Sequence, residues 1–177
     1  MIDPALAWIA AAATALVLTR SAVLKLADFA RFRGAVDDYR IVPGGLGLVV
    51  AVLLPTAEAG ASAMLLVPAT RPWGGMLALA VLGVVSAAVA INLARGRSEI
   101  ECGCGGPGQR ISAALLGRNL ALAAVAALAL LPPDGRALAP LDAALVAAGA
   151  LMWAGLYLVA DRLLATRDLF RQRGALP

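Results

Sequence analysis

The sequence predicts an all-α integral membrane protein, a bundle of transmembrane helices. Of its 177 residues, 62% are hydrophobic and 15% are charged, and the mean hydropathy is +0.86. Soluble domains carry about 45–50% apolar and about 25% charged residues. The excess of Ala, Leu and Val lies in long blocks, which is typical of membrane spans. The chain has no histidine, and this excludes imidazole as a general base or as a metal or haem ligand.

Five apolar blocks are close to the ~20 residues that a helix needs to cross a hydrocarbon layer of about 30 Å. Helix-breaking residues separate them at 43–45, 68–72 and 132–135. Basic residues follow the first block rather than precede it, so we expect a permanent span and not a cleaved signal peptide. The whole chain, 1–177, is predicted to be one transmembrane domain with spans at about 5–24, 46–68, 73–93, 111–131 and 141–164.

The connection from Asp28 to Pro43 is amphipathic, because its apolar side chains recur at helical spacing: Phe29, Phe32, Val36 and Tyr39. Two interpretations stay open. The segment lies along the lipid headgroups, with its arginines near anionic lipid, or it forms a lid over the loop that carries the cysteines.

Basic residues are unevenly distributed between the two sides of the predicted bundle. One side holds eleven of the fifteen: Lys25, Arg31, Arg33, Arg40, Arg95, Arg97, Arg110, Arg162, Arg167, Arg171 and Arg173. The opposite side holds Arg71 and Arg136. Basic loops stay cytoplasmic, so we expect a multi-pass protein of the bacterial inner membrane with its N-terminus outside. The Cys102/Cys104 loop and the C-terminus are then cytoplasmic. Arginines spread over short loops do not predict nucleic-acid binding.

Several polar residues lie inside the predicted spans, where each charge costs a few kcal/mol: Arg20, Glu58, Asn92, Arg118 and Asn119. The guanidinium of Arg20 or Arg118 is long enough to reach Glu58. The result is either a structural ion pair that fixes helix register or a polar pocket beneath the cysteine loop. Lys25 and Arg20 lie near a span end, where snorkelling to the headgroups is sufficient. Asp142 and Asp161 are interpreted as capping and tail residues.

Cys102 and Cys104 are the only cysteines, and Gly103 separates them in a glycine-rich loop. Such a pair can close a strained, readily exchanged disulfide or hold a soft ion such as Cu(I). A zinc site is not expected, since no further Cys or His is present. Arg118 or Lys25 would stabilise a thiolate, whereas Glu99 and Glu101 would oppose one. Two inert cysteines are the remaining alternative.

Four segments together resemble the methylamine utilisation protein MauE family, which is related to DoxX: Asn92-Leu93-Ala94-Arg95-Gly96, Cys102-Gly103-Cys104, Ile111-Ser112 and Gly117-Arg118-Asn119-Leu120. Lys25 to Phe29, Tyr39, Pro43 and Glu58 also fit its pattern, so the resemblance covers roughly residues 15 to 131. It implies a four-helix DoxX-like core, to which the chain adds a fifth, C-terminal helix. Gly105 stands where the family usually has an aromatic residue, which leaves room for a different partner.

The resemblance implies a role in maturing a periplasmic amine dehydrogenase, through disulfide formation or transport, alongside a thioredoxin-like protein or a dehydrogenase subunit. Our first hypothesis is a membrane thiol–disulfide component with Cys102 and Cys104 as catalytic residues. Lys25, Glu58, Arg118 and Asn119 would shape the site beneath them. A quinone or a partner's cysteines would complete electron transfer across the bilayer. The rival hypotheses are a carrier for a soft metal ion or small solute and a non-catalytic assembly scaffold, so enzymatic activity stays an open question.

Overall fold

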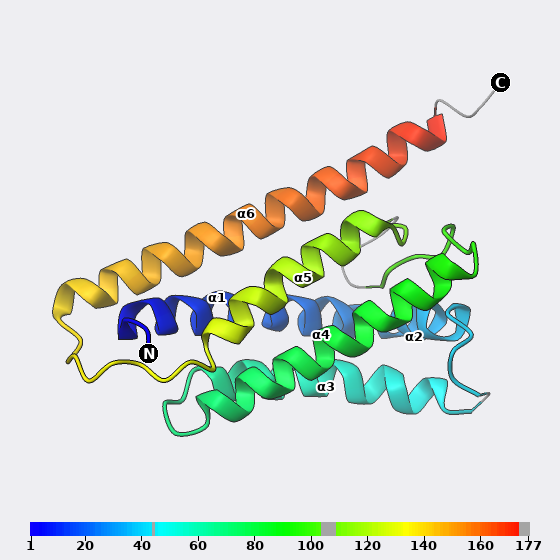
Figure 1. Cartoon of the computed structure of the whole chain (residues 1–177). Helices are drawn as coiled ribbons and strands as arrows, with labels where there is room; N and C mark the ends of the chain where they lie inside the picture. The colour runs from blue at the N-terminus through cyan, green and yellow to red at the C-terminus, as the bar shows by residue number, and fades with distance from the viewer. Residues whose placement is uncertain (44, 104–108, 174–177) are drawn as a thin grey trace.

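The computed structural model describes residues 1–43, 45–103 and 109–173. This part of the chain forms six helices (Figure 1): α1 (Pro4–Ala27), α2 (Phe29–Asp38), α3 (Gly47–Leu65), α4 (Arg71–Ala94), α5 (Ala113–Leu128) and α6 (Pro140–Arg173). Four of the described helices are long and apolar enough to cross a membrane, namely α1, α3, α4 and, over Pro140–Thr166, α6. The predicted fold class, an all-α membrane helical bundle, is confirmed.

The fourth predicted span, 111–131, is longer than the helix found there. With 16 residues, α5 is about 24 Å long at 1.5 Å per residue, which is less than the hydrocarbon thickness. It begins after Ile111, whose backbone N–H instead donates to the carbonyl of Ile100 at 3.0 Å. It ends at Leu128 and is followed by a turn. A full crossing by α5 therefore stays a prediction.

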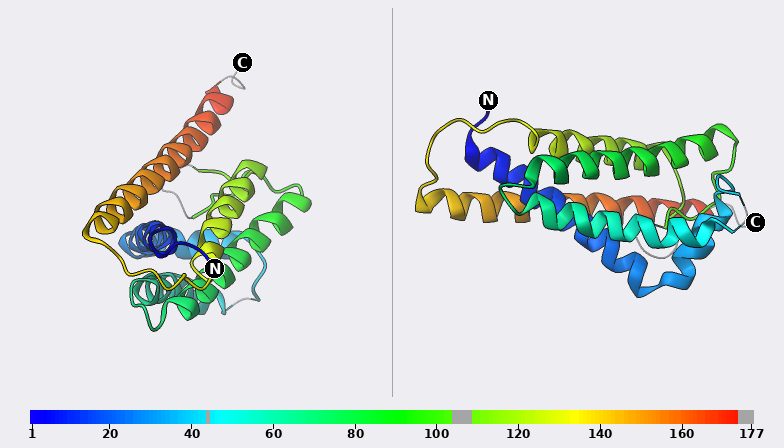
Figure 2. Two further views of the ribbon diagram at one scale, coloured as in Figure 1. Left: turned by 60° about the vertical axis from the view of Figure 1, so that its left-hand side comes forward. Right: turned by 90° about the horizontal axis from the view of Figure 1, so that it is seen from below.

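Asp28 makes the sharp junction between α1 and α2. Its backbone N–H donates to the carbonyl of Leu24, which closes α1, and its carboxylate accepts from the N–H of Arg31 at 3.3 Å, which caps α2. Such side-chain caps satisfy the orphan N–H groups of a helix start. As a result α2 turns off the axis of α1 and packs against α3 (Figure 2).

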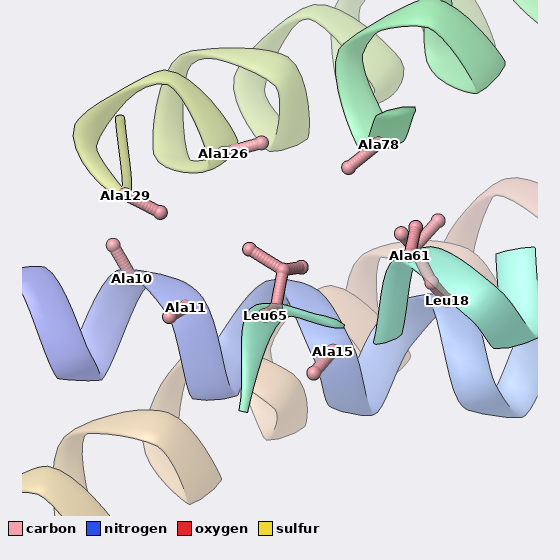
Figure 3. Close-up of a cluster of buried hydrophobic side chains, with 9 residues drawn as sticks. All are labelled: Ala10, Ala11, Ala15, Leu18, Ala61, Leu65, Ala78, Ala126 and Ala129. Carbon is pink, nitrogen blue, oxygen red and sulfur yellow. The ribbon is translucent and has the colours of Figure 1, made fainter. Parts of the chain in front are cut away.

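The centre of the bundle is built mainly from alanine. Helix α1 packs against α3, α4, α5 and α6, and seven of the nine buried residues in the main cluster are alanines (Figure 3). Small side chains let helices approach closely where lipid supplies no hydrophobic drive for helix association. One close approach to backbone is at Gly74, where an added Cβ would lie 2.6 Å from the backbone N of Leu65. Many of the larger apolar residues lie on the outside of the bundle, for example Leu120, which is 72% exposed.

The two ends of the bundle carry different loops. At one end Ile2 donates to the carbonyl of Pro132 at 3.2 Å, so the N-terminus lies beside the α5–α6 connection. The opposite end holds α2, the described part of the cysteine loop and the C-terminal end of α6 (Figure 1). This grouping agrees with the loops that the charge count assigned to one side. That this side faces the cytoplasm stays a prediction.

Candidate functional site

Cys102 lies in a structured, buried turn at the α2 end of the bundle. Its backbone N–H donates to the carbonyl of Gln109 at 2.8 Å, and Glu101 pairs with Arg110 in an antiparallel bridge. Cys102 is 5% exposed and belongs to an apolar cluster with Tyr39 and others. Cys104 falls outside the described residues. The first cysteine of the pair is thus held by backbone hydrogen bonds and by packing.

Helix α2 covers this turn. Gly103 has φ of 69°, and a Cβ there would lie 3.3 Å from Cβ of Ala35 and 3.3 Å from the ring of Phe32. Both the left-handed backbone and the close approach therefore favour glycine. The hydroxyl of Tyr39 donates to the carbonyl of Cys102 at 3.4 Å. Helix α2 therefore lies over the cysteine turn, and a position along the lipid headgroups stays a prediction.

The two carboxylates that precede Cys102 are both paired with arginines. Glu101 accepts from Nη2 of Arg31 at 2.7 and 2.8 Å and from its Nε at 3.0 Å, and Glu99 forms an ion pair with Arg110. These pairs are partly exposed and contribute little to stability. Their arginines nevertheless offset the negative charge that was expected to oppose a thiolate.

Lys25 and Glu58 form a buried ion pair beneath α2. Nζ of Lys25 lies 2.6 Å from Oε1 and 2.8 Å from Oε2 of Glu58, and it also donates to Oγ of Ser21 at 2.5 Å. The side chain of Lys25 is 0% exposed, so the expectation that it snorkels to the headgroups is wrong. Its ammonium lies 5.5 Å from the ring centroid of Phe32, the ring that contacts the cysteine turn.

Asp161 of α6 is the centre of a second buried polar cluster. It is 1% exposed and forms ion pairs with Arg118 and, at 3.2 Å, with Arg20. Nε2 of Gln109 donates to it at 3.2 Å. The interpretation of Asp161 as a tail residue is wrong because α6 continues to Arg173. The arginines proposed as partners of Glu58 bind Asp161, and the cation bonded to both oxygens of Glu58 is Lys25.

Asn119 and a small cavity connect the two clusters. Oδ1 of Asn119 accepts from Arg118 at 3.3 Å, and its Nδ2 donates to Ser86 at 3.3 Å. A cavity of about 20 Å³ is lined by Glu58, Arg118 and Asn119 together with Ser21 and Tyr157. All four predicted supporting residues therefore belong to one buried polar region between helices.

Two larger cavities flank the cysteine turn. One, of about 170 Å³, contains charged residues in its lining and lies on the polar side of the turn. It is lined by Lys25, Asp28, Arg31, Glu101 and Gly103 with apolar neighbours. The other, of about 280 Å³, is lined by apolar residues and by Cys102. Phe32 and Ala35 line both cavities. The turn therefore lies between a polar cavity and an apolar one.

Three residues of this region were not predicted from the sequence. Ser21 lies one turn before Lys25 on the same helix face, a spacing that could have indicated it. Asp161 was recognised as a charge but judged to lie at a helix end. Gln109 carries no sequence signal, because its importance comes from pairing with Cys102 across the turn.

A known protein family and several of its individual members match this chain. The family model described as "Methylamine utilisation protein MauE" matches residues 3–132. The chain belongs to the MauE family. The match ends before α6, so Asp161, the partner of Arg118, is supplied by a helix outside the matched region. The MauE core corresponds to α1 to α5, and the structure gives it the form of a multi-pass membrane bundle.

Individual MauE relatives cover most of the chain. It is 37% identical to "Methylamine utilization protein MauE" of Paracoccus versutus over 76% of this chain and 76% of the relative. It is 38% identical to the protein of the same name from Paracoccus denitrificans, over 71% and 69% of the two chains. The protein of that name from Methylophilus methylotrophus is 41% identical over 58% of this chain and 54% of its own length. No solved structure matches the chain.

Proposed function

We propose that this MauE protein is a membrane thiol–disulfide component that supports the maturation of a periplasmic amine dehydrogenase-like partner, through disulfide formation or transport. The relatives' names, which refer to methylamine utilisation, support the process. The observation that carries the proposal is the construction of the turn around Cys102. The backbone N–H and the carbonyl of Cys102 are both hydrogen-bonded, and helix α2 is packed onto the turn.

The proposed chemistry is exchange between Cys102, Cys104 and a pair of cysteines in the partner. A partner thiolate attacks one sulfur of the Cys102–Cys104 disulfide, the S–S bond breaks, and a mixed disulfide forms with release of the other thiolate. The partner's second thiolate then attacks the mixed disulfide, which leaves the partner oxidised and this protein as the dithiol. Each exchange conserves electrons, so the dithiol must later pass two electrons to an acceptor.

The polar residues below the turn have a positioning role in this proposal. Lys25 contacts Phe32, which contacts the turn, while Gln109 joins the backbone of Cys102 to Asp161 and Arg118. Both routes hold the turn over charges that are themselves fixed between helices. We propose a thioredoxin-like protein or a dehydrogenase subunit as the partner. Because the charge count predicts a cytoplasmic turn, a periplasmic partner would be reached by a relay across the bilayer that a quinone or a partner's cysteines complete.

Replacing each cysteine by serine tests the proposal. In cells that depend on this protein, Cys102→Ser and Cys104→Ser should reduce amine dehydrogenase activity to the level of a deletion, with unchanged amounts in the membrane. Ser98→Ala, an exposed change in the same loop, is the matched control and should retain full activity. In one of the two serine variants the remaining thiol should trap a mixed disulfide visible on a non-reducing gel. Full activity in both serine variants would refute the proposal and favour a scaffold.

The same variants distinguish a metal carrier. Stoichiometric Cu(I) binding that both serine changes abolish, without any mixed disulfide, would favour a carrier over a thiol–disulfide component. Labelling Cys102 and Cys104 in intact cells with a membrane-impermeant thiol reagent, with and without prior reduction, tests the cytoplasmic position that the charge count predicts. Labelling from outside would place the turn in the periplasm.

A further inference from the structure

The apolar cavity beside Cys102 has the features of a small-molecule site. Its volume is about 280 Å³, close to the lower end of the ~300–1,000 Å³ that is usual for ligand pockets. Its lining comes from α2, the connection between α2 and α3, α3, α4 and the cysteine turn. Most of this lining is apolar, and the exceptions are Cys102 and the phenol of Tyr39. An apolar pocket with few polar groups is the usual form of a site for a lipophilic ligand.

The cavity opens toward lipid and closes at the cysteine. Val84 and Ile41 of the lining are 63% and 39% exposed, whereas Tyr39 and Cys102 are 9% and 5% exposed. The exposed residues form its rim, and the buried ones form its inner end. A ligand dissolved in the bilayer therefore reaches Cys102 without crossing the aqueous surface.

The depth of the cavity also places it within the hydrocarbon layer. On α3 its lining includes Val50 and Leu54, which lie about 5 and 10 Å from the helix start at Gly47 at 1.5 Å per residue. On α4, Val84 lies about 15 Å from the helix end at Ala94. The cavity thus occupies the half of a ~30 Å layer that is nearer the cysteine turn.

We infer that this cavity binds the ring of a membrane-dissolved quinone, which serves as the oxidant of the dithiol. The inference rests on the proposed function. The two thiols of Cys102 and Cys104 lose two electrons and two protons as the S–S bond forms. The quinone gains both, and its two carbonyl groups become the hydroxyl groups of the quinol.

A quinone satisfies two constraints together. It is apolar enough to enter from the bilayer, and it accepts the two electrons that disulfide formation releases. Cys102 is 5% exposed and lines the apolar cavity, so this acceptor is kept apart from a protein partner on the polar side. The dithiol can then exchange with a protein on the polar side and with a quinone on the apolar side.

Photolabelling of the full-length protein in lipid nanodiscs tests the inference. The probe is an azido derivative of decylubiquinone, and unlabelled decylubiquinone is the competitor. Competed label should map to α2, α3 or α4 at the cavity. Cys102→Ser should retain this label, because binding precedes electron transfer. Reduced wild-type protein under anaerobic conditions should form about one quinol per chain, as a two-electron couple requires, and Cys102→Ser should form none.

Ala88→Leu and Ala87→Leu are matched variants on adjacent positions of α4. Ala88 lines the cavity, whereas Ala87 is exposed and is not part of the lining. Filling the site should weaken competed labelling about tenfold, which corresponds to roughly 1.4 kcal/mol of binding free energy. Ala87→Leu adds the same atoms toward lipid and should leave labelling unchanged.

The outcomes separate this inference from the proposed function. Labelling that decylubiquinone does not displace, or that a photoactivatable acyl chain gives equally, would overturn the quinone site while the cysteine variants still decide the function. Equal labelling of the two alanine variants would also overturn it. Competed label without quinol formation would overturn the oxidant role. Full maturation activity in the serine variants would refute the proposed function, whatever the labelling shows.

Discussion

Replacement of Lys25 or Glu58 by Met should show that the buried ion pair is needed as a unit. Both side chains are almost fully buried, and their charged atoms are 2.6 to 2.8 Å apart. At an effective dielectric constant of about 20 their attraction is on the order of 6 kcal/mol, and desolvation offsets much of it. Removing one partner leaves an uncompensated buried charge, so each single change should cost about 3–5 kcal/mol of unfolding free energy.

The double variant Lys25→Met/Glu58→Met should behave differently. It removes both charges and fills the space with side chains of similar length, and such replacements are often neutral or stabilising. Ser21, which donates to Glu58 at 3.1 Å, can turn its hydroxyl to the carbonyl one turn earlier in α1. We expect the double variant to lie within about 1 kcal/mol of the wild type.

The assay is the free energy of unfolding of the detergent-solubilised protein, measured for all four members of the cycle. Arg33→Met and Glu99→Met change exposed charges of the same kinds and should stay within about 0.5 kcal/mol of wild type. Single Met variants that cost less than 1 kcal/mol, or a double variant that costs the sum of the two, would refute the reasoning. Dehydrogenase activity of the stable double variant then separates a structural pair from a functional one.

Three further changes test other parts of the structure. Asp161→Asn leaves Arg118 without its buried carboxylate and should cost about 3–5 kcal/mol, whereas the exposed change Asp38→Asn should cost little; equal losses would contradict the cluster. Gly103→Ala should cost about 1–3 kcal/mol for its positive φ, while Gly34→Ala, in an open helical position, should stabilise the protein. A hydrogen bond from Arg136 lowers the pKa of Asp3 below its ordinary value, so the stability from this pair is present at neutral pH and is lost as pH falls below about 4. The melting temperature should therefore fall more steeply between pH 6 and pH 3 in the wild type than in Arg136→Gln.

The bundle was predictable because hydropathy reports directly on burial in lipid. Four apolar blocks correspond to α1, α3, α4 and α6, and the last three begin at or beside proline- and glycine-containing segments read from the sequence. The start of α5 was not predictable in this way. Ile111 is apolar enough to extend the helix, but its backbone pairs with Ile100 in the cysteine turn. Hydropathy describes side chains and carries no information about such a backbone partner.

The polar residues of the site were predictable individually, but their pairing was not. A charged side chain inside a membrane span requires a polar partner, and this rule identified Glu58 and Arg118 as candidate site residues. The choice of partner depends on the rotation of each helix and on side-chain reach, which position along the chain does not reveal. Lys25 lies near the end of its helix but turns inward. Glu58 and Ser21 there accept three hydrogen bonds from its ammonium and replace the hydrogen bonds to water and headgroups that it loses.

The position of Asp161 shows why the site cannot be reduced to the part of the chain that matches the family. Arg118 lies inside the matched part and is almost fully buried. The carboxylate that pairs with it, that of Asp161, comes from α6, which lies outside the matched part. Arg20 shares this carboxylate but is 27% exposed, so water or headgroups offset much of its charge. Asp161 therefore chiefly neutralises Arg118. The same carboxylate binds Gln109, which fixes the backbone of Cys102, so α6 both stabilises the buried arginine and holds the cysteine turn in place.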